Sequence, residues 1–341
     1  MKDISADTVL SAINSKPPKA PSKAFSKTKI WLIKLMPYLG LVIVFALFTI
    51  LTKGDLVSAK SLDTIISQSA ILMVVSVGAV FVYTLGGMDL SIGSAVGVAA
   101  IAGAGMVSAI PDINPFIVLL VCIVVGLVTG AFNATLSNIL NLPTFLGSLA
   151  TMSVCSSITS AIIRSLGISG IRVRSSAWKA LDNYWVLLIA FVAVALICYC
   201  IYNYTKIGKY ARAIGSNRTC AQQSGVKLKK YITFAFMVSG FAIGVAAWLT
   251  IIRYKIVSDA TGAGLQLDVI LAIVIGGMPV TGGARSRISA AIVGSLTLAF
   301  LGQGLTLCGV DAMHIQTIRG LLFIIILAIT CFKKRYDVLP R

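Results

Sequence analysis

The sequence predicts an all-α membrane protein whose helices cross a lipid bilayer about ten times. Of its 341 residues, 57% are hydrophobic and only 12% are charged, whereas a soluble domain carries roughly a quarter charged residues. The mean hydropathy of +0.95 is correspondingly high. The 29 Lys and Arg residues lie almost entirely between long apolar runs. Most of the chain is therefore expected to lie in lipid.

The apolar runs define the individual helices. A helix needs roughly 20 apolar residues to cross a hydrocarbon core about 30 Å thick, and it must pair its backbone polar groups internally. We therefore expect a transmembrane domain over residues 31–332. Its runs occupy residues 31–52, 62–84, 91–110, 115–137, 143–163, 185–203, 231–252, 267–281, 288–308 and 312–332.

The basic segments indicate the orientation. Residues 1–30 are polar, basic and proline-containing, which favours a disordered arm and not a cleaved signal. Residues 205–230 contain seven basic residues and no acidic one, and residues 333–341 begin with three basic residues. Because Lys and Arg are retained on the cytoplasmic side, we expect all three segments in the cytoplasm. Ten spans satisfy this arrangement.

The loop at 164–184 is an exception, because the same topology places its basic residues outside with only Asp182 opposing them. Two interpretations remain open. Either a span is miscounted or the loop crosses despite its charge, since the charge rule is a bias, or the basic residues form an outer docking surface for an acidic partner. The candidate docking residues are Arg172, Arg174 and Arg253.

Two glycine motifs lie 190 residues apart: GGMDLSIG at 86–93 and GGMPVTGG at 276–283. Interruptions at corresponding places in two halves of a membrane protein indicate discontinuous helices beside a transport path. Close packing through small residues is the structural alternative. We favour the path, because packing alone does not require the same order twice. Its candidate residues are Gly86, Gly87, Ser91, Gly276, Gly277 and Thr281.

The ionisable residues Asp89, set deepest among the apolar runs, and Arg319, in the last run, call for an explanation. An acid such as Asp89 at membrane depth indicates a functional residue, but it can also cap the following helix. We favour the structural role, because Pro279 occupies the equivalent place in the second motif. Arg319 in the last run is expected to pair with a carboxylate or with carbonyl groups.

The fourth and fifth runs contain several polar residues with two open interpretations. They either line a route for a hydroxyl-rich solute or form hydrogen bonds between helices. These residues are Asn133, Thr135, Asn138, Thr144, Ser148 and Thr151.

Several other classes of protein are disfavoured. The basic residues are dispersed among spans and do not gather on one soluble face, so we expect no nucleic-acid partner. The seven cysteines form no CxxC pair and His314 stands alone, so we expect no metal site. No catalytic constellation and no GxxxxGK[ST] phosphate loop occur in the sequence. We therefore expect the chain to be no enzyme.

Four segments in this order resemble the ribose-type sugar permease family of bacterial ABC importers, within the branched-chain amino acid and ribose permease superfamily. The likeness covers most of residues 60–332. The segments are GGMDLSIGS at 86–94, GAFNATLSNILNLPTFLGSLATM at 130–152, AIGSNRTCAQQSG at 213–225 and LDVILAIVIGGMPVTGGARS at 267–286.

The resemblance implies a type II importer fold of ten helices in two related halves, in a multi-pass protein of the bacterial cytoplasmic membrane with both termini inside. It also implies a second permease chain, an ATPase subunit that holds ATP and Mg, and a periplasmic or lipid-anchored binding protein, with membrane lipid around them. This chain itself is expected to hold no cofactor. Asn133 and Phe145 of the second segment join the candidates for the translocation path.

In this family the segment corresponding to 205–230 contacts the ATPase. Its basic residues also suit anionic lipid headgroups. The candidate coupling residues are Arg212, Gly215, Asn217, Arg218 and Gly225.

The chain departs from the family pattern at Ala134, which follows Asn133, and at Ala284 and Arg285 in the second glycine motif. These departures leave the solute open: a sugar is favoured, and a nucleoside or a branched-chain amino acid is the alternative. An ion-coupled secondary transporter is a third class, because such proteins also have repeats and broken helices. It would need a second membrane acid near Asp89, for which Asp268 is the candidate.

Overall fold

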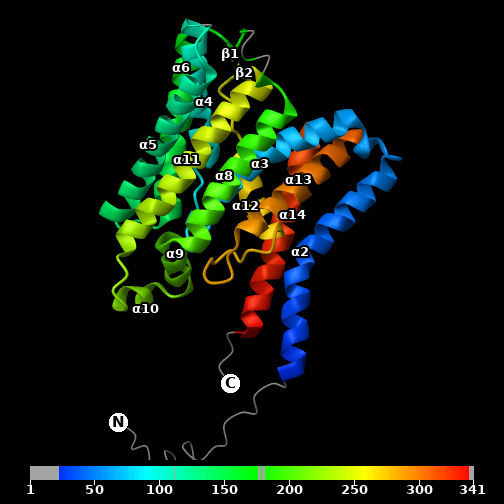
Figure 1. The fold of residues 1–341 in the computed structure, drawn as a ribbon, viewed down its shortest axis with the longest axis vertical. Helices are drawn as coiled ribbons and strands as arrows, with labels where there is room; N and C mark the ends of the chain where they lie inside the picture. The colour runs from blue at the N-terminus through cyan, green and yellow to red at the C-terminus, as the bar shows by residue number, and fades with distance from the viewer. Residues whose placement is uncertain (1–22, 111, 176–177, 179–180, 338–341) are drawn as a thin grey trace, which may run out of the picture. The chain divides into compact units, whose positions relative to one another are not determined.

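The computed structural model describes residues 23–110, 112–175, 178 and 181–337. This part of the chain is almost entirely helical (Figure 1), so the all-α prediction is confirmed. The helices are α2 (Lys23–Leu51), η1 (Asp55–Val57), α3 (Ala59–Thr84), α4 (Ile92–Ala109), α5 (Pro115–Ile139), α6 (Thr144–Ser165), α8 (Tyr184–Tyr204), α9 (Lys206–Ser216), α10 (Arg218–Gln223), α11 (Leu228–Tyr254), α12 (Leu265–Ile275), α13 (Ile288–Leu307) and α14 (Ala312–Asp337).

Each predicted apolar run contains one helix, but the run 267–281 is helical only to Ile275, where α12 ends. Seven helices of the described part are long and apolar enough to cross a bilayer: α3, α4, α5, α6, α8, α11 and α13. Three further apolar stretches are shorter, at Leu35–Leu51, Leu265–Ile275 and Met313–Ile325. The chain is therefore a multi-pass membrane protein.

Residues 1–36 and 37–341 form separate units, and the site described below lies in the second. Helix α2 begins at Lys23, so residues 23–30 of the expected disordered arm are helical. Residues 1–22 lie outside the described part of the chain. At the other end, α14 continues to Asp337 and takes in part of the expected tail at 333–341.

The long helices divide into central and peripheral ones. In α3 and α11, 83% of the apolar window is buried inside the protein, but in α5 and α8 only 28% and 17% are buried. On α5 the exposed side chains include Phe116, Leu120, Val124 and Val128. Their spacing of four residues places them on one helical face, which suits contact with lipid.

Helices α5 and α11 approach closely through glycine. A Cβ atom at Gly126 would overlap the carbonyl oxygen of Gly240, and one at Gly240 would overlap that of Gly126. Without side chains at these positions the two backbones can touch, which is a common basis for helix association in membranes. This contact holds the peripheral helix α5 against the central helix α11.

The two glycine motifs end their helices in the same way. Gly86 after α3 and Gly277 after α12 have φ of +76° and +88°, and both serve as left-handed helix ends. The following amides also bond back into the last turn: Gly87 to Val82 at 3.2 Å and Met278 to Ile273 at 3.1 Å. Gly277 is thus the structural counterpart of Gly86, one residue later than the alignment by 190 residues implies.

The connections after these motifs differ. Residues 85–91 join two long helices, α3 and α4, whereas α12 has only 11 residues and is followed by the longer non-helical segment 276–287. A bilayer-spanning helix needs roughly 20 residues, so the helix discontinuity is clearest in the second half.

The two ends of the bundle carry different elements (Figure 1). Helices α9 and α10 lie at one end, which we call the α9 end. The short strands β1 (Ile171–Arg172) and β2 (Ile256–Val257) lie at the opposite end. They pair antiparallel, with Ile171 opposite Val257 and Arg172 opposite Ile256.

Candidate translocation and coupling site

The end of α3 meets the second glycine motif directly. The backbone N–H of Gly283 donates a hydrogen bond to the carbonyl oxygen of Thr84 at 2.9 Å. Gly282 lies against the same turn, where a Cβ atom would be 2.6 Å from the Thr84 carbonyl oxygen and 2.7 Å from the Gly86 nitrogen. The two related motifs are therefore in backbone contact with each other.

Helix α9 packs onto this contact. A Cβ atom at Gly215 would overlap the Thr84 carbonyl oxygen and lie 2.7 Å from the Gly283 nitrogen. The Ser216 hydroxyl accepts a hydrogen bond from the N–H of Ala284 at 2.9 Å. The predicted coupling segment thus touches the end of α3, just before the first glycine motif, and the second glycine motif itself.

Tyr202 of α8 ties the same elements together from the side. Its hydroxyl lies 3.0 Å from the Thr84 hydroxyl and donates to the Ser286 carbonyl at 3.0 Å. Its ring packs edge-on against Phe81 at 5.3 Å. We call Thr84, Tyr202, Gly215 and Gly283 the coupling junction. The sequence analysis missed Tyr202 and Thr84, because nothing in their local sequence indicates partners so far along the chain.

The coupling candidates divide into packed and exposed residues. The Arg212 guanidinium lies 4.8 Å from the centre of the Tyr202 ring and donates to the Tyr202 carbonyl at 3.5 Å, so it faces the protein. The Asn217 side chain caps α10 by accepting from the N–H of Cys220 at 2.9 Å. Arg218 and Gly225 are exposed. Arg218 and Gly225 are thus coupling candidates that face the solvent.

A buried polar cluster joins the first glycine motif to α5 and α6. Asp89 accepts from the N–H and the hydroxyl of Ser91 at 3.0 and 2.7 Å. The Asn133 amide donates to the Ser91 hydroxyl at 2.8 Å and accepts from Thr151 at 2.5 Å. Asp89 is 1% exposed and Asn133 is 2% exposed. Each of these side chains is thus engaged in holding the turn before α4.

The start of α6 supplies hydrogen-bond partners for the non-helical backbone of that turn. The Thr144 hydroxyl accepts from the N–H of Met88 at 3.3 Å, and the Ser148 hydroxyl accepts from the N–H of Leu90 at 3.0 Å. Phe145 beside them is 44% exposed. Such partners are needed where backbone leaves the helix at membrane depth.

The remaining polar candidates lie towards the end of α5. Asn138 bonds across to the carbonyl oxygen of Lys229 and to Thr233 of α11. Thr135 is exposed and bonds within its own helix to the Ala131 carbonyl. Hydrogen bonding between elements is thus observed for every one of the six open candidates except Thr135.

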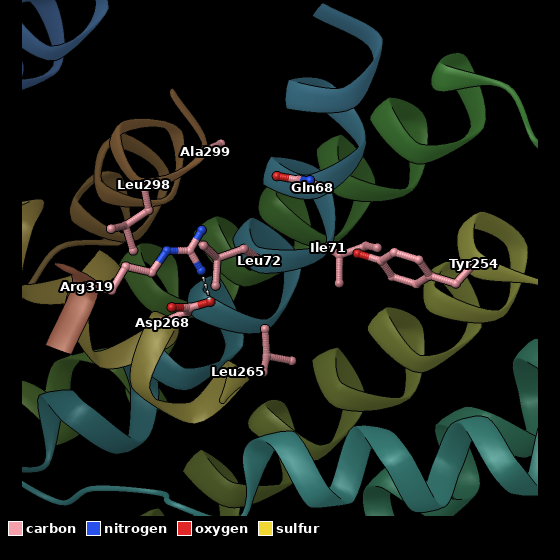
Figure 2. Close-up of a pocket in the computed structure, with 9 residues that line it drawn as sticks. All are labelled: Gln68, Ile71, Leu72, Tyr254, Leu265, Asp268, Leu298, Ala299 and Arg319. Atoms are coloured by element: carbon pink, nitrogen blue, oxygen red, sulfur yellow. Dashed lines mark hydrogen bonds and ion pairs between the residues drawn. The ribbon is translucent and has the colours of Figure 1, made fainter. Parts of the chain in front are cut away.

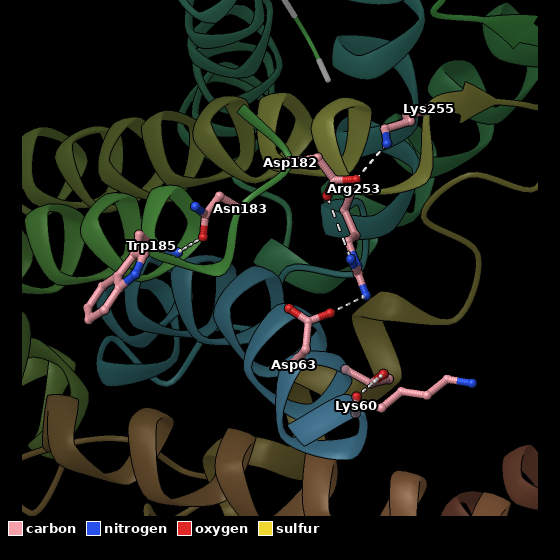
Figure 3. Close-up of polar contacts among 8 residues, drawn as sticks. Lys60, Asp63, Asp182, Asn183, Trp185, Arg253 and Lys255 are labelled. Carbon is pink, nitrogen blue, oxygen red and sulfur yellow. Dashed lines mark hydrogen bonds and ion pairs between the residues drawn. The ribbon is translucent and has the colours of Figure 1, made fainter. Parts of the chain in front are cut away.

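At the β1 end, ion pairs occupy part of the predicted docking surface. Figure 3 shows Arg253 between Asp63 and Asp182, at 3.2 and 3.6 Å, and Lys255 bonded to Asp182. Arg172 and Arg174 are exposed. Arg253 is therefore engaged within the chain, while the other two docking candidates face outward.

Arg319 pairs with a carboxylate, as the sequence predicts. Its Nη1 donates to Asp268 Oδ2 at 2.7 Å and joins α14 to the start of α12. The pair borders a cavity of about 260 Å³ that also contacts α3 and α13 (Figure 2). Asp89 and Asp268 thus have separate partners, Ser91 and Arg319.

The fold and these sites define a multi-pass membrane protein of the transporter class, in which the non-helical segment 276–287 joins the short helix α12 to α13 and contacts α9. A family model described as the branched-chain amino acid transport system, permease component, matches residues 61–329. This chain belongs to that family.

Curated relatives resemble the chain over most of its length. The ribose import permease protein RbsC of Haemophilus influenzae is 25% identical, with 86% of this chain and 92% of the relative covered. The protein of the same name from Bacillus subtilis is 28% identical, covering 86% and 91%. The galactose/methyl galactoside import permease protein MglC of Haemophilus influenzae is 27% identical, covering 80% and 86%. No solved structure matches the chain.

Proposed function

We propose that this chain is the transmembrane permease subunit of an ATP-binding cassette importer for a sugar or a similar small polar solute. The coupling junction carries the proposal, because the segment expected to meet an ATPase touches there both the end of α3, which leads into the first glycine motif, and the second glycine motif. The names of the relatives, which are import permeases for ribose and galactose, support a sugar as the solute.

In this proposal the ATPase subunit binds ATP and Mg and hydrolyses the nucleotide, while this chain performs no covalent chemistry. Closure of the ATPase would push on α9 and α10. Because Gly215 and Ser216 touch Thr84 and Ala284, a displacement of α9 has to move the end of α3 and the segment 276–287. That segment is continuous with α12, so the movement reaches the interior of the membrane domain.

The β1 end would receive the solute from a binding protein outside the cell. The exposed Arg172 and Arg174 provide positive charge for an acidic docking partner, and Arg253 would support this surface through its ion pairs with Asp63 and Asp182. With the basic segments inside, both termini would lie in the cytoplasm of a bacterial cell. A second permease chain would complete the translocation path.

A branched-chain amino acid as the solute and an ion-coupled secondary transporter as the class agree less well with these observations. The family description names branched-chain amino acids, but the relatives reported above are named for sugars. A proton- or ion-coupled mechanism would favour acids that share one site, whereas Asp268 is paired with Arg319 and Asp89 with Ser91.

The proposal is tested by purifying the tagged chain from its native membrane and identifying the subunits that accompany it. The complex is then placed in proteoliposomes with the accompanying binding protein. We expect an ATPase subunit to co-purify and labelled sugar to enter only when ATP is supplied on the α9 side. Uptake by the chain alone without ATP would contradict the proposal in favour of a secondary transporter.

A further inference from the structure

We propose that a cavity at the α9 end binds the phosphate group of an anionic phospholipid. The cavity lies between the end of α5, helix α10 and the start of α11. The inference goes beyond the proposed transport function, because it assigns a second ligand and a defined site for it. The lining residues that carry the argument are Ser137, Asn138, Arg218, Lys227 and Lys229.

The position of the cavity suits a lipid headgroup. Both α5 and α11 are long and apolar enough to cross a bilayer, and the cavity occupies the place where α5 ends at Ile139 and α11 begins at Leu228. Figure 1 shows α10 beside the start of α11 at this end of the bundle. The volume of about 450 Å³ falls within the range of roughly 300–1,000 Å³ that is common for small-molecule sites.

The charge of the lining favours an anion. Among the described residues that line the cavity, Arg218, Lys227 and Lys229 are basic and none is acidic. The ion pairs of the described part of the chain involve other residues, so these three positive charges are not compensated there. Clusters of Lys and Arg beside a membrane span are typical of sites for anionic headgroups.

The start of α11 adds to this demand for negative charge. A helix is stabilised by acidic residues in its first turn and disfavours basic ones there. Helix α11 has no acid in its first turn, and no described side chain caps it. Lys227 occupies the N-cap position, and Lys229 and Lys230 follow in the first turn. A phosphate group at this place would accept from free backbone N–H groups and offset the charges of the lysines.

Two polar residues of α5 shape the opposite wall. The Asn138 amide donates to the Lys229 carbonyl at 3.0 Å and to the Thr233 hydroxyl at 2.9 Å, which holds the end of α5 against the start of α11. Ser137 is only 6% exposed, and its hydroxyl has no hydrogen-bond partner among the described residues. Since no bond holds this hydroxyl, it can turn towards a bound headgroup without breaking a contact.

The apolar surface beside the cavity favours a lipid over a free phosphate ion. Val128, Phe132 and Ile139 of α5 are 61%, 45% and 70% exposed. Their spacing of four and seven residues places them on one helical face. Ile139 directly follows Asn138, which lines the cavity. A phospholipid with its phosphate in the cavity can therefore lay its acyl chains along this face.

An acidic side chain of an ATPase subunit is the competing occupant, because Arg218 is exposed at the start of α10. Lys227 and Lys229 instead stand at the start of a helix that is apolar enough to cross the bilayer. Together with the exposed apolar face of α5, their position favours the lipid.

The test uses the chain purified together with the subunits that accompany it. Native mass spectrometry counts the lipid molecules on each complex as dioleoyl phosphatidylglycerol or dioleoyl phosphatidylcholine is titrated. The double variant Lys227→Gln/Lys229→Gln removes two charges from the cavity and leaves Arg218 in place. Lys206→Gln/Lys209→Gln is the matched control, because it removes two exposed charges from α9 that do not line the cavity.

We expect the parent complex to bind phosphatidylglycerol more tightly than phosphatidylcholine. Loss of two lysines should weaken the binding of phosphatidylglycerol about 30-fold, while the control variant should bind it like the parent. The double variant should still co-purify with the ATPase subunit.

Equal binding of the two lipids by the parent, or of phosphatidylglycerol by the parent and the double variant, would overturn the inference. Displacement of the lipid by excess inorganic phosphate would assign the cavity to a soluble anion and overturn the lipid as its occupant. Loss of the ATPase subunit from the double variant, with lipid binding unchanged, would overturn the inference in favour of a protein contact. The titration involves neither nucleotide nor solute, so its result is independent of the proposed function.

Discussion

The backbone N–H of Gly283 lies 2.9 Å from the carbonyl oxygen of Thr84, although the two residues belong to different halves of the chain. An ordinary helix end leaves such a carbonyl to water or to a cap. Here it accepts a hydrogen bond from the second glycine motif and is covered by Gly215 of α9. Three separate segments thus depend on one peptide group.

Replacing Gly215 with alanine should separate these segments. The added Cβ atom would overlap the Thr84 carbonyl oxygen, and overpacking of this kind costs about 1–3 kcal/mol. We expect ATP-driven uptake to fall about tenfold or more, while ATPase activity loses its dependence on loaded binding protein. Gly105→Ala is the matched control, because an added Cβ there has no atom within 4 Å. Normal coupling in Gly215→Ala would refute a role of this contact.

Charge reversal should distinguish Arg212 from Arg218. Arg218 is exposed, so Arg218→Glu should weaken association with the ATPase and reduce transport, with little effect on thermal stability. Arg212 packs on Tyr202, so Arg212→Glu should lower the thermal unfolding temperature as well. Co-purification of the ATPase and a melting curve measure the two effects. Solute-stimulated ATPase activity that is unchanged in the double variant would remove both residues from the coupling mechanism.

Loss of the Asn133 side chain should destabilise the first glycine motif. Asn133→Ala leaves the Ser91 hydroxyl and the Thr151 hydroxyl without this partner, at a cost of about 1–3 kcal/mol per unsatisfied buried group. Thermal unfolding in detergent should show the loss. Thr135→Ala is the control, because Thr135 is exposed and bonds only to its own helix. Equal melting temperatures for the two variants would contradict the structural role of the cluster.

The basic residues at the β1 end predict electrostatic docking. Replacing Arg172 and Arg174 with glutamate should weaken binding of the purified binding protein to the complex, because the charge facing an acidic partner is reversed. Docking to the parent chain should also weaken as salt is raised. If neither raised salt nor the substitutions change the affinity of the binding protein for the complex, the two arginines have no role in docking.

Much of the fold follows from local sequence. Each of the apolar runs contains one helix, because hydropathy and length are properties of contiguous residues; the run 267–281 ended early, at Ile275, where the second glycine motif begins. The offset of 190 residues pairs Gly86 with Gly276, but the glycine with the matching positive φ is Gly277. The sign of φ depends on where the helix ends and not on the presence of glycine alone.

Long-range partners were harder to predict. The requirement that Arg319 be paired was clear from its place in an apolar run, but not that Asp268 is the partner. Tyr202 bonds to Thr84, which lies 118 positions earlier in the chain, and to Ser286, which lies 84 positions later. No pattern along a single sequence encodes such contacts. The polar residues of α5 and α6 could be recognised as important, while their role in holding the turn at 88–90 required the three-dimensional structure.

The non-helical segment 276–287 bears on how the protein is made. Because the segment is not helical, its backbone groups need hydrogen-bond partners from other elements. Two of these elements, α3 and α9, come earlier in the chain. They leave the ribosome first and can assemble in the membrane before the segment is synthesised. The last fifth of the polypeptide therefore meets neighbours that have already been synthesised.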